Sequence, residues 1–581
     1  MNKSLVLFQA GPVQSFIAAA RSTRDLWSGS YMLSWLMAAA AKALTETAGT
    51  PVDETIIFPK LSKLGVYQLR TNCQAGKALP EKEEEKRLQF LLNPAMPNRF
   101  LAIVPADKAE ASAKAAEKAF RDELTAIGDA VWKFLQEQGA RSDWKNRWDE
   151  QIKLLPEITW QTLQVGDLAT DEIYAEAYKD CQSLLAARRN TRNFDQFKTD
   201  VDQERFRESE ETTQSPFKDT ITGKEEIIGT DAFQKALFEK SKRGDKNERL
   251  GAISLIKRFW HEEYLRKEYF SLPAKKFYGP ISYDTVPEIA EKNTDRNNPY
   301  VALIAMDGDK MGEWMNGDRR LPTYENDLKD HHKNFSERLA NFSNEDAGRL
   351  VRNHGGQLIY AGGDDVLAML PATRVFKCVC ELQKAFKEQV DRKQADVSCG
   401  IAIAHKKYPL QRMVKEAQLA EKRAKNDYGR GAFAFSLLKH GGEIVRWGAK
   451  WGNKVPECVT PENKISPEKA KWDCKARECF EKFCEWQEKE IVSGRFPYAL
   501  AGYLAPYALE KKQLSINPSE IKEILKAELA TVVERQVPAK GVRNEIQEIC
   551  EEYIEEVAKE CRWGDFIKLF LTAAFIYRKR D

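Results

Sequence analysis

Four aspartates in two short stretches are the residues of this sequence best suited to chemistry. Asp307 and Asp309 lie in "MDGDKMG" after the apolar run "PYVALIA", and Asp364 and Asp365 lie between two apolar runs in "YAGGDDVLAML". The Gly-Gly-Asp-Asp stretch alone is typical of a tight hairpin turn, since glycine adopts positive φ and aspartate bonds to nearby backbone. A turn does not require two adjacent carboxylates, and the upstream pair favours a catalytic site.

Carboxylates that meet in a fold repel one another unless cations bind among them. Oxygen atoms are the ligands that Mg²⁺ and Mn²⁺ prefer, and we expect two such ions at these aspartates. A pair of divalent ions can polarise a triphosphate, activate an attacking hydroxyl and stabilise the leaving pyrophosphate. The aspartates therefore predict nucleotidyl transfer at the α-phosphorus of a nucleoside triphosphate.

Glycines and lysines near these aspartates are candidates for binding the triphosphate. Gly308, Gly362 and Gly363 would let the backbone approach phosphates without a Cβ in the way. Lys422 and Lys425 lie near the end of a predicted helix over 409–427 and share one face of it, since they are three residues apart. The alternative for both lysines is a solvated, charged helix end.

Alternating strands and helices must position the four aspartates. A buried strand over 300–306 is followed by helical sequence, the Gly-Gly-Asp-Asp hairpin, a helix over 372–390, a strand over 395–405 and the helix over 409–427. This β-α-β-β-α-β order is the ferredoxin-like arrangement of nucleotide-polymerising palm domains. It places the end of the first strand beside the hairpin tip. The stretch "DHHK" at 330–333 is typical of an exposed helix face.

The rest of the chain divides into three further parts. Residues 1–170 show a second α+β pattern, in which strand "SLVLFQA" precedes two helical segments separated by a turn at Ser28-Gly29-Ser30. Residues 171–290 are polar and helical, residues 291–454 hold the aspartates, and residues 455–581 are helical and highly charged. We therefore expect an α+β protein with two palm domains, a helical linker domain and a C-terminal helical domain.

Composition restricts the environment of the chain. Its 581 residues exceed what one hydrophobic core usually serves, and its net charge is only +3, so contacts with nucleic acid must come from local patches. Eleven cysteines without a secretory signal indicate reduced thiols and a cytoplasmic protein. No apolar stretch is long enough for a membrane span, so we expect no membrane partner.

The chain resembles the large polymerase/cyclase subunit of type III CRISPR RNA-guided effector complexes, most closely the type III-B (Cmr) form. The resemblance rests on "GPVQSFIAAARSTRDLWSGSYMLSWL", "ERLGAISLIKRFW", "PYVALIAMDGDKMGEWM", "GGQLIYAGGDDVLAMLP", "SCGIAIAHKKYPL" and "AEKRAKNDYGRGAFAF", in this order. It implies two palm domains, the second similar to nucleotidyl cyclases. It also implies that target RNA switches on the conversion of ATP into cyclic oligoadenylates, second messengers in antiviral defence.

The resemblance assigns roles to residues of the second palm. Asp307, Asp364 and Asp365 would be catalytic and hold the metal ions, together with the carbonyl of Gly308. The nucleotide-binding residues that we expect beside this set are Asp309, Lys310, Gly362, Gly363, Lys422 and Lys425.

The first palm has "FQAGPVQ" where the second has "MDGDKMG". It lacks the acidic pair, and the resemblance implies that it binds an acceptor ATP without metal chemistry of its own. Ser22, Arg24 and Ser30 are candidates for that acceptor pocket, with helix capping or solvation as the alternative for each.

Two departures from the family concern its other activities. Many relatives begin with an HD nuclease domain, whereas this chain starts near the first palm strand and contains no His-Asp pair, so we expect no DNase activity. Zinc-binding relatives carry two Cys-x-x-Cys pairs in the linker. The corresponding positions here are Asp219 and Thr222, and Gly251 and Ser254, so we expect no zinc. Cysteines 458, 474, 479 and 484 lack the spacing of a replacement site.

The product and the partners follow from the resemblance only in outline. Two alternatives to cyclic oligoadenylate synthesis stay open. If the first palm binds an acceptor other than ATP, the product is an adenylated small molecule. If the second palm is catalytically silent, the chain is an RNA-binding scaffold subunit. We expect the other subunits of the effector complex, the guide CRISPR RNA and target RNA as partners, with sequence specificity in guide pairing. The basic stretch "AARRNTRNF" is a candidate contact for them or a solvated helix end.

Overall fold

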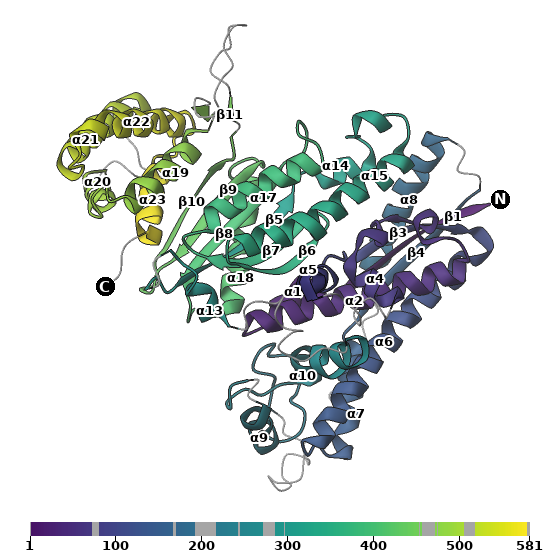
Figure 1. The fold of residues 1–581 in the computed structure, drawn as a ribbon. Helices are drawn as coiled ribbons and strands as arrows, with labels where there is room; N and C mark the ends of the chain where they lie inside the picture. The colour runs from purple at the N-terminus through teal and green to yellow at the C-terminus, as the bar shows by residue number, and fades with distance from the viewer. Residues whose placement is uncertain are drawn as a thin grey trace.

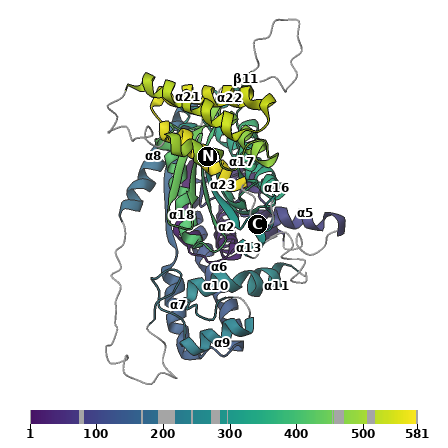
Figure 2. The same cartoon turned by 90° about the vertical axis from the view of Figure 1, so that its left-hand side faces the viewer.

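Two β-sheets covered by helices form the centre of this computed structural model (Figure 1). It describes residues 2–72, 81–166, 170–191, 217–241, 244–270, 285–294, 297–452, 454–455, 471–472, 474–504 and 517–577. In both views the C-terminal helices and the linker helices α9 (Asp231–Ser241) and α10 (Ala252–Trp260) lie at opposite ends of the molecule (Figures 1 and 2). Among the described helices, none combines the length and apolar character that spanning a bilayer requires.

The first sheet has four antiparallel strands in the order β2-β3-β1-β4. Its strands are β1 (Lys3–Gly11), β2 (Ile56–Phe58), β3 (Arg99–Pro105) and β4 (Glu157–Gly166). Alternate residues of β1 face opposite sides, as a strand requires. Val6 and Phe8 pack under helices α2 (Thr23–Ala48) and α6 (Ala109–Glu137), while Leu5 and Leu7 pack against α8 (Asp171–Asn190). The order of the strands in the sheet, with helices between β1 and β2 and between β3 and β4, confirms the predicted ferredoxin-like fold of the first palm. The expected division at residue 170 assigns α8 to the linker, whereas its apolar side packs on this sheet.

The second sheet has six strands in the order β10-β9-β8-β5-β7-β6. Its strands are β5 (Tyr300–Gly308), β6 (Gln357–Gly362), β7 (Asp365–Pro371), β8 (Val397–His405), β9 (Ala432–Leu438) and β10 (Ile444–Lys450). Strands β8, β5, β7 and β6 are antiparallel and form the predicted ferredoxin-like palm, and β9 adds to it in parallel with β8. Strand β5 lies between β7 and β8, so residues at its end lie in the middle of the sheet.

Helices pack on both faces of the second sheet. Met413 and Val414 of α18 (Leu410–Asn426) share a core with the first palm, and this core includes Leu303 of β5. The opposite face packs against α17 (Val375–Gln389) and the C-terminal helices. The two palms are therefore joined by continuous apolar packing. The remaining helices of the palms are α1 (Gln14–Ala18), α3 (Val52–Thr55), α4 (Gly65–Thr71), α5 (Glu81–Leu91), α7 (Lys145–Leu154), α14 (Met311–Asn316), α15 (Leu328–Asn341) and α16 (Gly348–Asn353).

The linker and the C-terminal part are helical, as expected. The linker also contains α11 (Lys267–Tyr269) and α13 (Val286–Ala290), and a π-helical turn over His261–Arg266 continues α10. The C-terminal helices are α19 (Lys475–Glu488), α20 (Phe496–Leu504), α21 (Pro518–Gln536), α22 (Arg543–Glu560) and α23 (Trp563–Tyr577). Strands β11 (Lys454–Val455) and β12 (Lys471–Trp472) pair before them.

The predicted turn at Ser28-Gly29-Ser30 is wrong, because α2 runs through these residues without interruption. The break lies earlier, between α1 and α2, where the Ser22 side chain accepts a hydrogen bond from the Asp25 backbone N–H at 3.1 Å and caps α2. Position 29 of the helix requires a glycine, because the Lys257 side chain occupies the space where a larger side chain would lie. A Cβ at Gly29 would lie 2.3 Å from Lys257 Cε.

The prediction of an exposed face at "DHHK" is also wrong, because His331 and His332 are fully buried. His331 Nδ1 accepts a hydrogen bond from the Leu321 backbone N–H at 3.1 Å. The two ring nitrogens of His332 lie 2.8 Å from the Tyr174 hydroxyl and 2.7 Å from the Met315 carbonyl oxygen. Burial lowers the pKa of His332 to about 4, so the ring is neutral at pH 7.

Candidate active site

Strand register brings the two acidic stretches together. Met306 of β5 pairs with Val366 of β7, so the next residue along β5, Asp307, stands beside Asp365. Gly363 and Asp364 form the turn between β6 and β7, and Gly363 has a φ of +76°. Positive φ at the first of two turn residues matches a hairpin turn that favours glycine there.

Asp307, Asp364 and Asp365 form a cluster whose nearest carboxylate oxygens all lie within 4.8 Å of one another. Burial and the charge of Asp307 raise the pKa of Asp364 to about 7. Burial, a hydrogen bond to Asp307 and the neighbouring charges raise the pKa of Asp365 well above its ordinary value. Three carboxylates at this spacing offer the oxygen-only ligand set that suits Mg²⁺ or Mn²⁺. A bound cation would offset the repulsion among them.

Asp309 does not join this cluster. Its buried carboxylate accepts a hydrogen bond from the Ser398 hydroxyl at 2.7 Å and another from the Gly431 backbone N–H at 2.6 Å. Burial raises the pKa of Asp309 although both bonds oppose the shift. Asp309 therefore ties the end of β5 to β8 and to the segment before β9.

Gly308 and Gly362 make room for the protein's own side chains. A Cβ at Gly308 would lie 2.8 Å from the Asp364 Cβ, and a Cβ at Gly362 would lie 1.8 Å from the Tyr360 hydroxyl. Gly308 thus allows the hairpin tip to approach β5. Lys310 adopts a φ of +58° at the start of α14, and its ammonium lies 3.2 Å from the Glu313 carboxylate.

A cleft of about 1680 Å³ runs between the two palms and reaches the acidic cluster. From the second palm, its lining includes Asp307, Tyr360, Asp365, Gln418, Glu421 and Lys425. From the first palm and α8, its lining includes Gln9, Gly11, Gln14, Ile17, Asn98, Thr159, Arg188 and Arg189. The cleft is therefore bounded on one side by the carboxylates and on the other by polar and basic groups.

The two lysines predicted to bind the triphosphate, both on α18, lie in different surroundings. The Lys425 ammonium forms an ion pair with Asp307 and lies 2.6 Å from the Glu421 carboxylate. Burial lowers the pKa of Lys425, but its interactions with Asp307 and Glu421 outweigh this effect and raise it. Lys422 is exposed and is not among the described residues that line the cleft.

The three candidates for the acceptor pocket lie on or next to α2 and are not among the described residues that line the cleft. Ser22 caps α2, and Ser30 is fully buried inside that helix. Arg24 lies in the first turn of the helix. The first-palm wall is formed instead by the end of β1 and by α1, which precede α2 in the chain.

Several cleft residues escaped the sequence reasoning. Glu421 precedes Lys425 by four residues, and this spacing places both on one helix face, so the sequence contained a signal for it. Arg188 and Arg189 lie in the basic stretch predicted to contact RNA or other subunits, and the structure places them in the cleft wall. Gln9 and Tyr360 also had a local signal, because Gln9 occupies in "FQAGPVQ" the place of Asp307 in "MDGDKMG", and Tyr360 begins the stretch "YAGGDDVLAML".

At the linker positions where zinc cysteines would be expected, the Asp219 carboxylate joins the segment around Thr222 to the segment around Gly251. It accepts hydrogen bonds from the Ile221, Thr222 and Gly251 backbone N–H groups at 2.7, 2.9 and 2.8 Å. Cys458 lies outside the described residues, and Cys474, Cys479 and Cys484 are buried free thiols.

Comparisons with known proteins match both palms. The family model of the Cas10/Cmr2 second palm domain matches residues 300–434, and the family model of the N-terminal part of the CRISPR-associated protein Cmr2 matches residues 5–129. A curated relative, the CRISPR system Cmr subunit Cmr2 of Pyrococcus furiosus, is 24% identical over 569 residues. The match covers 77% of this chain and 63% of that relative, so the chain spans less than two thirds of its length.

Solved structures share the fold. A type III-B Cmr-beta structure in the apo state matches with a TM-score of 0.63 at 14% identity, over 93% of this chain and 78% of the other. A type III-B Cmr-beta structure bound to cognate target RNA matches with a TM-score of 0.62 at 14% identity, over 93% and 79% of the two chains. The two family models match the two palms in the order in which these lie along the chain, so both palms are similar to those of the Cas10/Cmr2 family.

Proposed function

We propose that the chain is the catalytic large subunit of a type III CRISPR effector complex, and that target RNA activates it to convert ATP into a cyclic oligoadenylate with release of pyrophosphate. The observation that carries this proposal is the cluster of Asp307, Asp364 and Asp365 at a cleft bounded by both palms. The relative named Cmr subunit Cmr2 and the related fold bound to target RNA support the assignment to such a complex.

The second palm supplies the groups for the transfer. Asp307, Asp364 and Asp365, together with the Gly308 carbonyl, would hold two Mg²⁺ or Mn²⁺ ions, which would neutralise charge and make the attacking hydroxyl more acidic. The hydroxyl oxygen forms a bond to the α-phosphorus of ATP while the bond to the leaving pyrophosphate oxygen breaks. Lys425, which forms an ion pair with Asp307, would be free to bind the triphosphate if a metal ion took its place at Asp307.

The first palm holds the acceptor nucleotide. Gln9 lies near the end of β1, and in "FQAGPVQ" it occupies the place that Asp307 has in "MDGDKMG", so a neutral amide stands where the second palm has a carboxylate. The Gln9 side-chain oxygen is buried, and no hydrogen-bond donor contacts it among the described residues. It can accept a hydrogen bond from an amino or hydroxyl group of the acceptor. Arg188 and Arg189 supply positive charge on the same side of the cleft.

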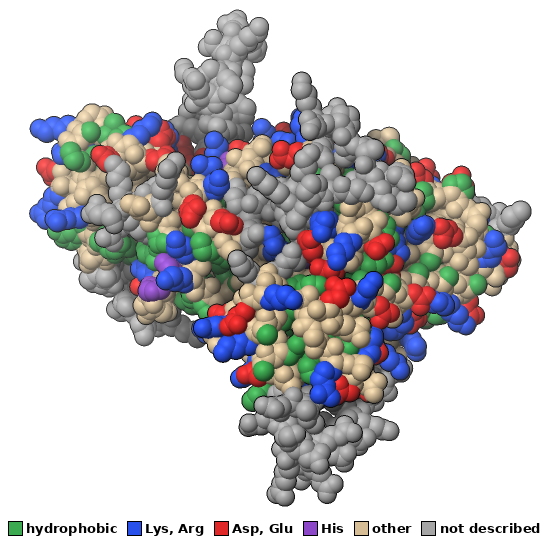
Figure 3. Space-filling view, turned by 60° about the horizontal axis from the view of Figure 1, so that its bottom comes forward, with side chains coloured by type: hydrophobic (Ala, Val, Ile, Leu, Met, Phe, Trp, Pro, Cys, Tyr) green, Lys and Arg blue, Asp and Glu red, His purple; other side chains and the backbone are tan. Residues whose placement is uncertain are grey.

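The proposed partners are the other subunits of the effector complex, the guide CRISPR RNA and the target RNA. On the face shown in Figure 3, basic and acidic side chains alternate over the surface, in agreement with the net charge of +3. Contacts with RNA on such a surface depend on the position of individual basic groups rather than on a general attraction.

A product assay on the assembled complex tests the proposal. The full chain, assembled with its partner subunits and guide RNA, is incubated with Mg²⁺ or Mn²⁺ and ATP labelled at the α-phosphate, with and without cognate target RNA. We expect a cyclic oligoadenylate by mass spectrometry only with target RNA, and none from the variant that carries both Asp364→Ala and Asp365→Ala. An adenylated small molecule would indicate a non-ATP acceptor, and the absence of product would indicate a scaffold subunit.

A further inference from the structure

A buried lysine of the linker, Lys257, caps the C-terminal end of α1, the short helix that lines the first-palm side of the cleft. The Lys257 ammonium donates hydrogen bonds to the backbone carbonyl oxygens of Phe16, Ile17 and Ala19 at 2.6, 3.0 and 2.7 Å. These carbonyls lie at the C-terminal end of α1, where a helix leaves acceptors unpaired. An ammonium has three N–H groups, so the three carbonyls match its donors one to one.

The first palm is shaped to admit this lysine. Gly29 of α2 leaves the space through which the side chain passes, and the Lys257 ammonium lies 4.9 Å from the centre of the Phe16 ring. The Ser28 hydroxyl donates a hydrogen bond to the Lys257 carbonyl oxygen. The Ser28 side chain also accepts a hydrogen bond from the Trp260 indole N–H at 2.8 Å. Contacts from α2 therefore fix both the backbone and the side chain of Lys257.

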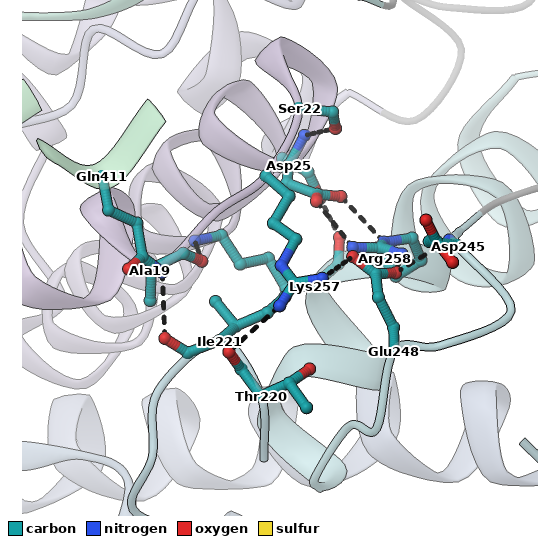
Figure 4. A network of polar contacts seen from close by, with 12 residues as sticks. Ala19, Ser22, Asp25, Thr220, Ile221, Asp245, Glu248, Lys257, Arg258 and Gln411 are labelled. Carbon is teal, nitrogen blue, oxygen red and sulfur yellow. Dashed lines mark hydrogen bonds and ion pairs between the residues drawn. The ribbon is translucent and has the colours of Figure 1, made fainter. Parts of the chain in front are cut away.

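A second buried cation holds the linker against the first palm beside Lys257 (Figure 4). Arg258 donates two hydrogen bonds to the Asp25 carboxylate at 3.0 and 2.8 Å and one to Glu248 at 2.5 Å. The Arg21 guanidinium lies 3.5 Å from the other Glu248 oxygen and donates a hydrogen bond to the Thr220 carbonyl oxygen at 3.2 Å. Ion pairs of Asp25 in α2 and of Arg21 just before α2 therefore join the first palm to the linker.

The same linker segment also bonds to the second palm. The Gln411 amide of α18 donates a hydrogen bond to the Ile221 carbonyl oxygen at 2.9 Å (Figure 4). The Asp219 carboxylate accepts from the Gly251 N–H at the start of α10, the helix that carries Lys257. Helix α1 also packs against α18, which bears Lys425. The linker thus contacts the helices that form both walls of the cleft.

From these contacts we infer that Lys257 is a positioning residue: it reaches from the linker to hold α1 at the distance from α18 that the acceptor nucleotide requires. Gln14 and Ile17 of α1 line the cleft, and the carbonyls that Lys257 binds belong to this helix or follow it directly. The inference rests on the proposed function, because it concerns the acceptor side of the same cleft. It adds a role for the linker in setting the shape of that side.

Two variants test this inference from opposite sides. Lys257→Met keeps the length of the side chain and removes its donors. Gly29→Ala places a methyl group where Lys257 passes, while alanine favours the helical conformation of α2 more than glycine does. In the assembled complex with target RNA, we expect each variant to raise the KM for ATP by about tenfold and to change kcat by less than about threefold. Hydrogen exchange at residues 17–20 should be faster by about tenfold.

Matched controls separate this role from general destabilisation. Lys240→Met changes an exposed lysine of α9 in the same linker, and Gly502→Ala adds a methyl group in α20 with no atom within 4 Å of it. Both should keep the wild-type KM and the wild-type exchange of residues 17–20. Wild-type KM and exchange in Lys257→Met and Gly29→Ala would overturn the inference. A wild-type complex that makes no nucleotide product would instead overturn the proposed function, while the exchange measurement would still decide whether Lys257 holds α1.

Discussion

The Lys425 ammonium of α18 contacts the Asp307 carboxylate near the end of the central strand β5, at the position where a metal ion would bind. Both side chains are largely buried, with 19% and 30% of their side-chain surface exposed. The lysine therefore places a positive charge beside the acidic cluster. A metal ion bound to Asp307 would compete with Lys425 for this carboxylate, and displacement of the lysine would leave its ammonium free to bind a triphosphate.

Lys425→Met tests this exchange. Without metal, the variant should lose about 1–3 kcal/mol of stability, because the Asp307 carboxylate loses its cationic partner. With Mn²⁺, the affinity for metal should be equal to or higher than that of the wild type, while product formation falls by about 10–100-fold through a higher KM for ATP. Calorimetry with Mn²⁺ and steady-state kinetics measure the two effects. The control Lys422→Met, on the exposed side of the same helix, should change neither, and weaker Mn²⁺ binding by Lys425→Met would contradict the competition.

The two palms could be predicted because their signals are local. Apolar runs separated by helical sequence determine the β-α-β-β-α-β order, and glycines with aspartates determine the hairpin at 362–365. The end of the apolar run at Asp307 and the hairpin tip at Asp364 predict that the two acidic stretches meet at one end of the sheet, whereas the pairing of Met306 with Val366 that sets Asp307 beside Asp365 comes from the structure, because continuous apolar runs do not fix a register.

The features that the sequence did not reveal depend on contacts between distant segments. Ser28-Gly29-Ser30 has the composition of a turn, but Lys257, more than 200 residues away, fills the space beside Gly29 and stabilises a continuous helix. His331 can be buried because Trp314 and Leu321 satisfy its ring nitrogens. Local composition gives no sign of such partners, and tertiary contacts override it.

The stability of the metal-free protein should depend on pH through Asp364. Its pKa is about 7 in the folded chain, above the ordinary aspartate value of 3.8 that applies to the unfolded chain, so the folded state binds more protons between these values. The contribution of Asp364 to the free energy of unfolding is fully present below pH 3.8 and is lost as the pH rises through about 7. Asp364→Asn should therefore be more stable than the wild type at pH 8, by more than about 1 kcal/mol, and nearly equal to it at pH 4.

Thermal unfolding in the presence of a chelator measures this difference. Addition of Mn²⁺ at pH 8 should raise the melting temperature of the wild type more than that of Asp364→Asn, since metal replaces the missing proton. A difference between the two proteins that is the same at pH 4 and pH 8 would show that ionisation of Asp364 does not oppose folding.

The linker should hold together without zinc. Asp219→Asn removes the anionic acceptor that bonds Ile221, Thr222 and Gly251, and it should cost about 1.5–3 kcal/mol of stability. The control Asp231→Asn, an exposed aspartate of the same linker, should cost less than about 1 kcal/mol. Elemental analysis should find no zinc in the purified protein, and a chelator should leave the unfolding of the linker unchanged. Stoichiometric zinc would contradict this account of Asp219.

Asp307 and Asp309 are separated by one residue and should nevertheless respond in opposite ways to the same substitution. Asp307→Asn removes a ligand from the acidic cluster and should weaken Mn²⁺ binding by at least about tenfold, a difference of about 1.4 kcal/mol. Asp309→Asn replaces one of the two oxygens that accept from Ser398 and Gly431 with an NH₂ group, so it should lower stability by about 1–3 kcal/mol and leave Mn²⁺ affinity within about threefold of the wild type. Titration followed by electron paramagnetic resonance of Mn²⁺ and chemical unfolding measure the two properties on the same samples. If Asp309→Asn lost Mn²⁺ as strongly as Asp307→Asn, Asp309 would belong to the metal site, and its bonds to Ser398 and Gly431 would have to break when metal binds.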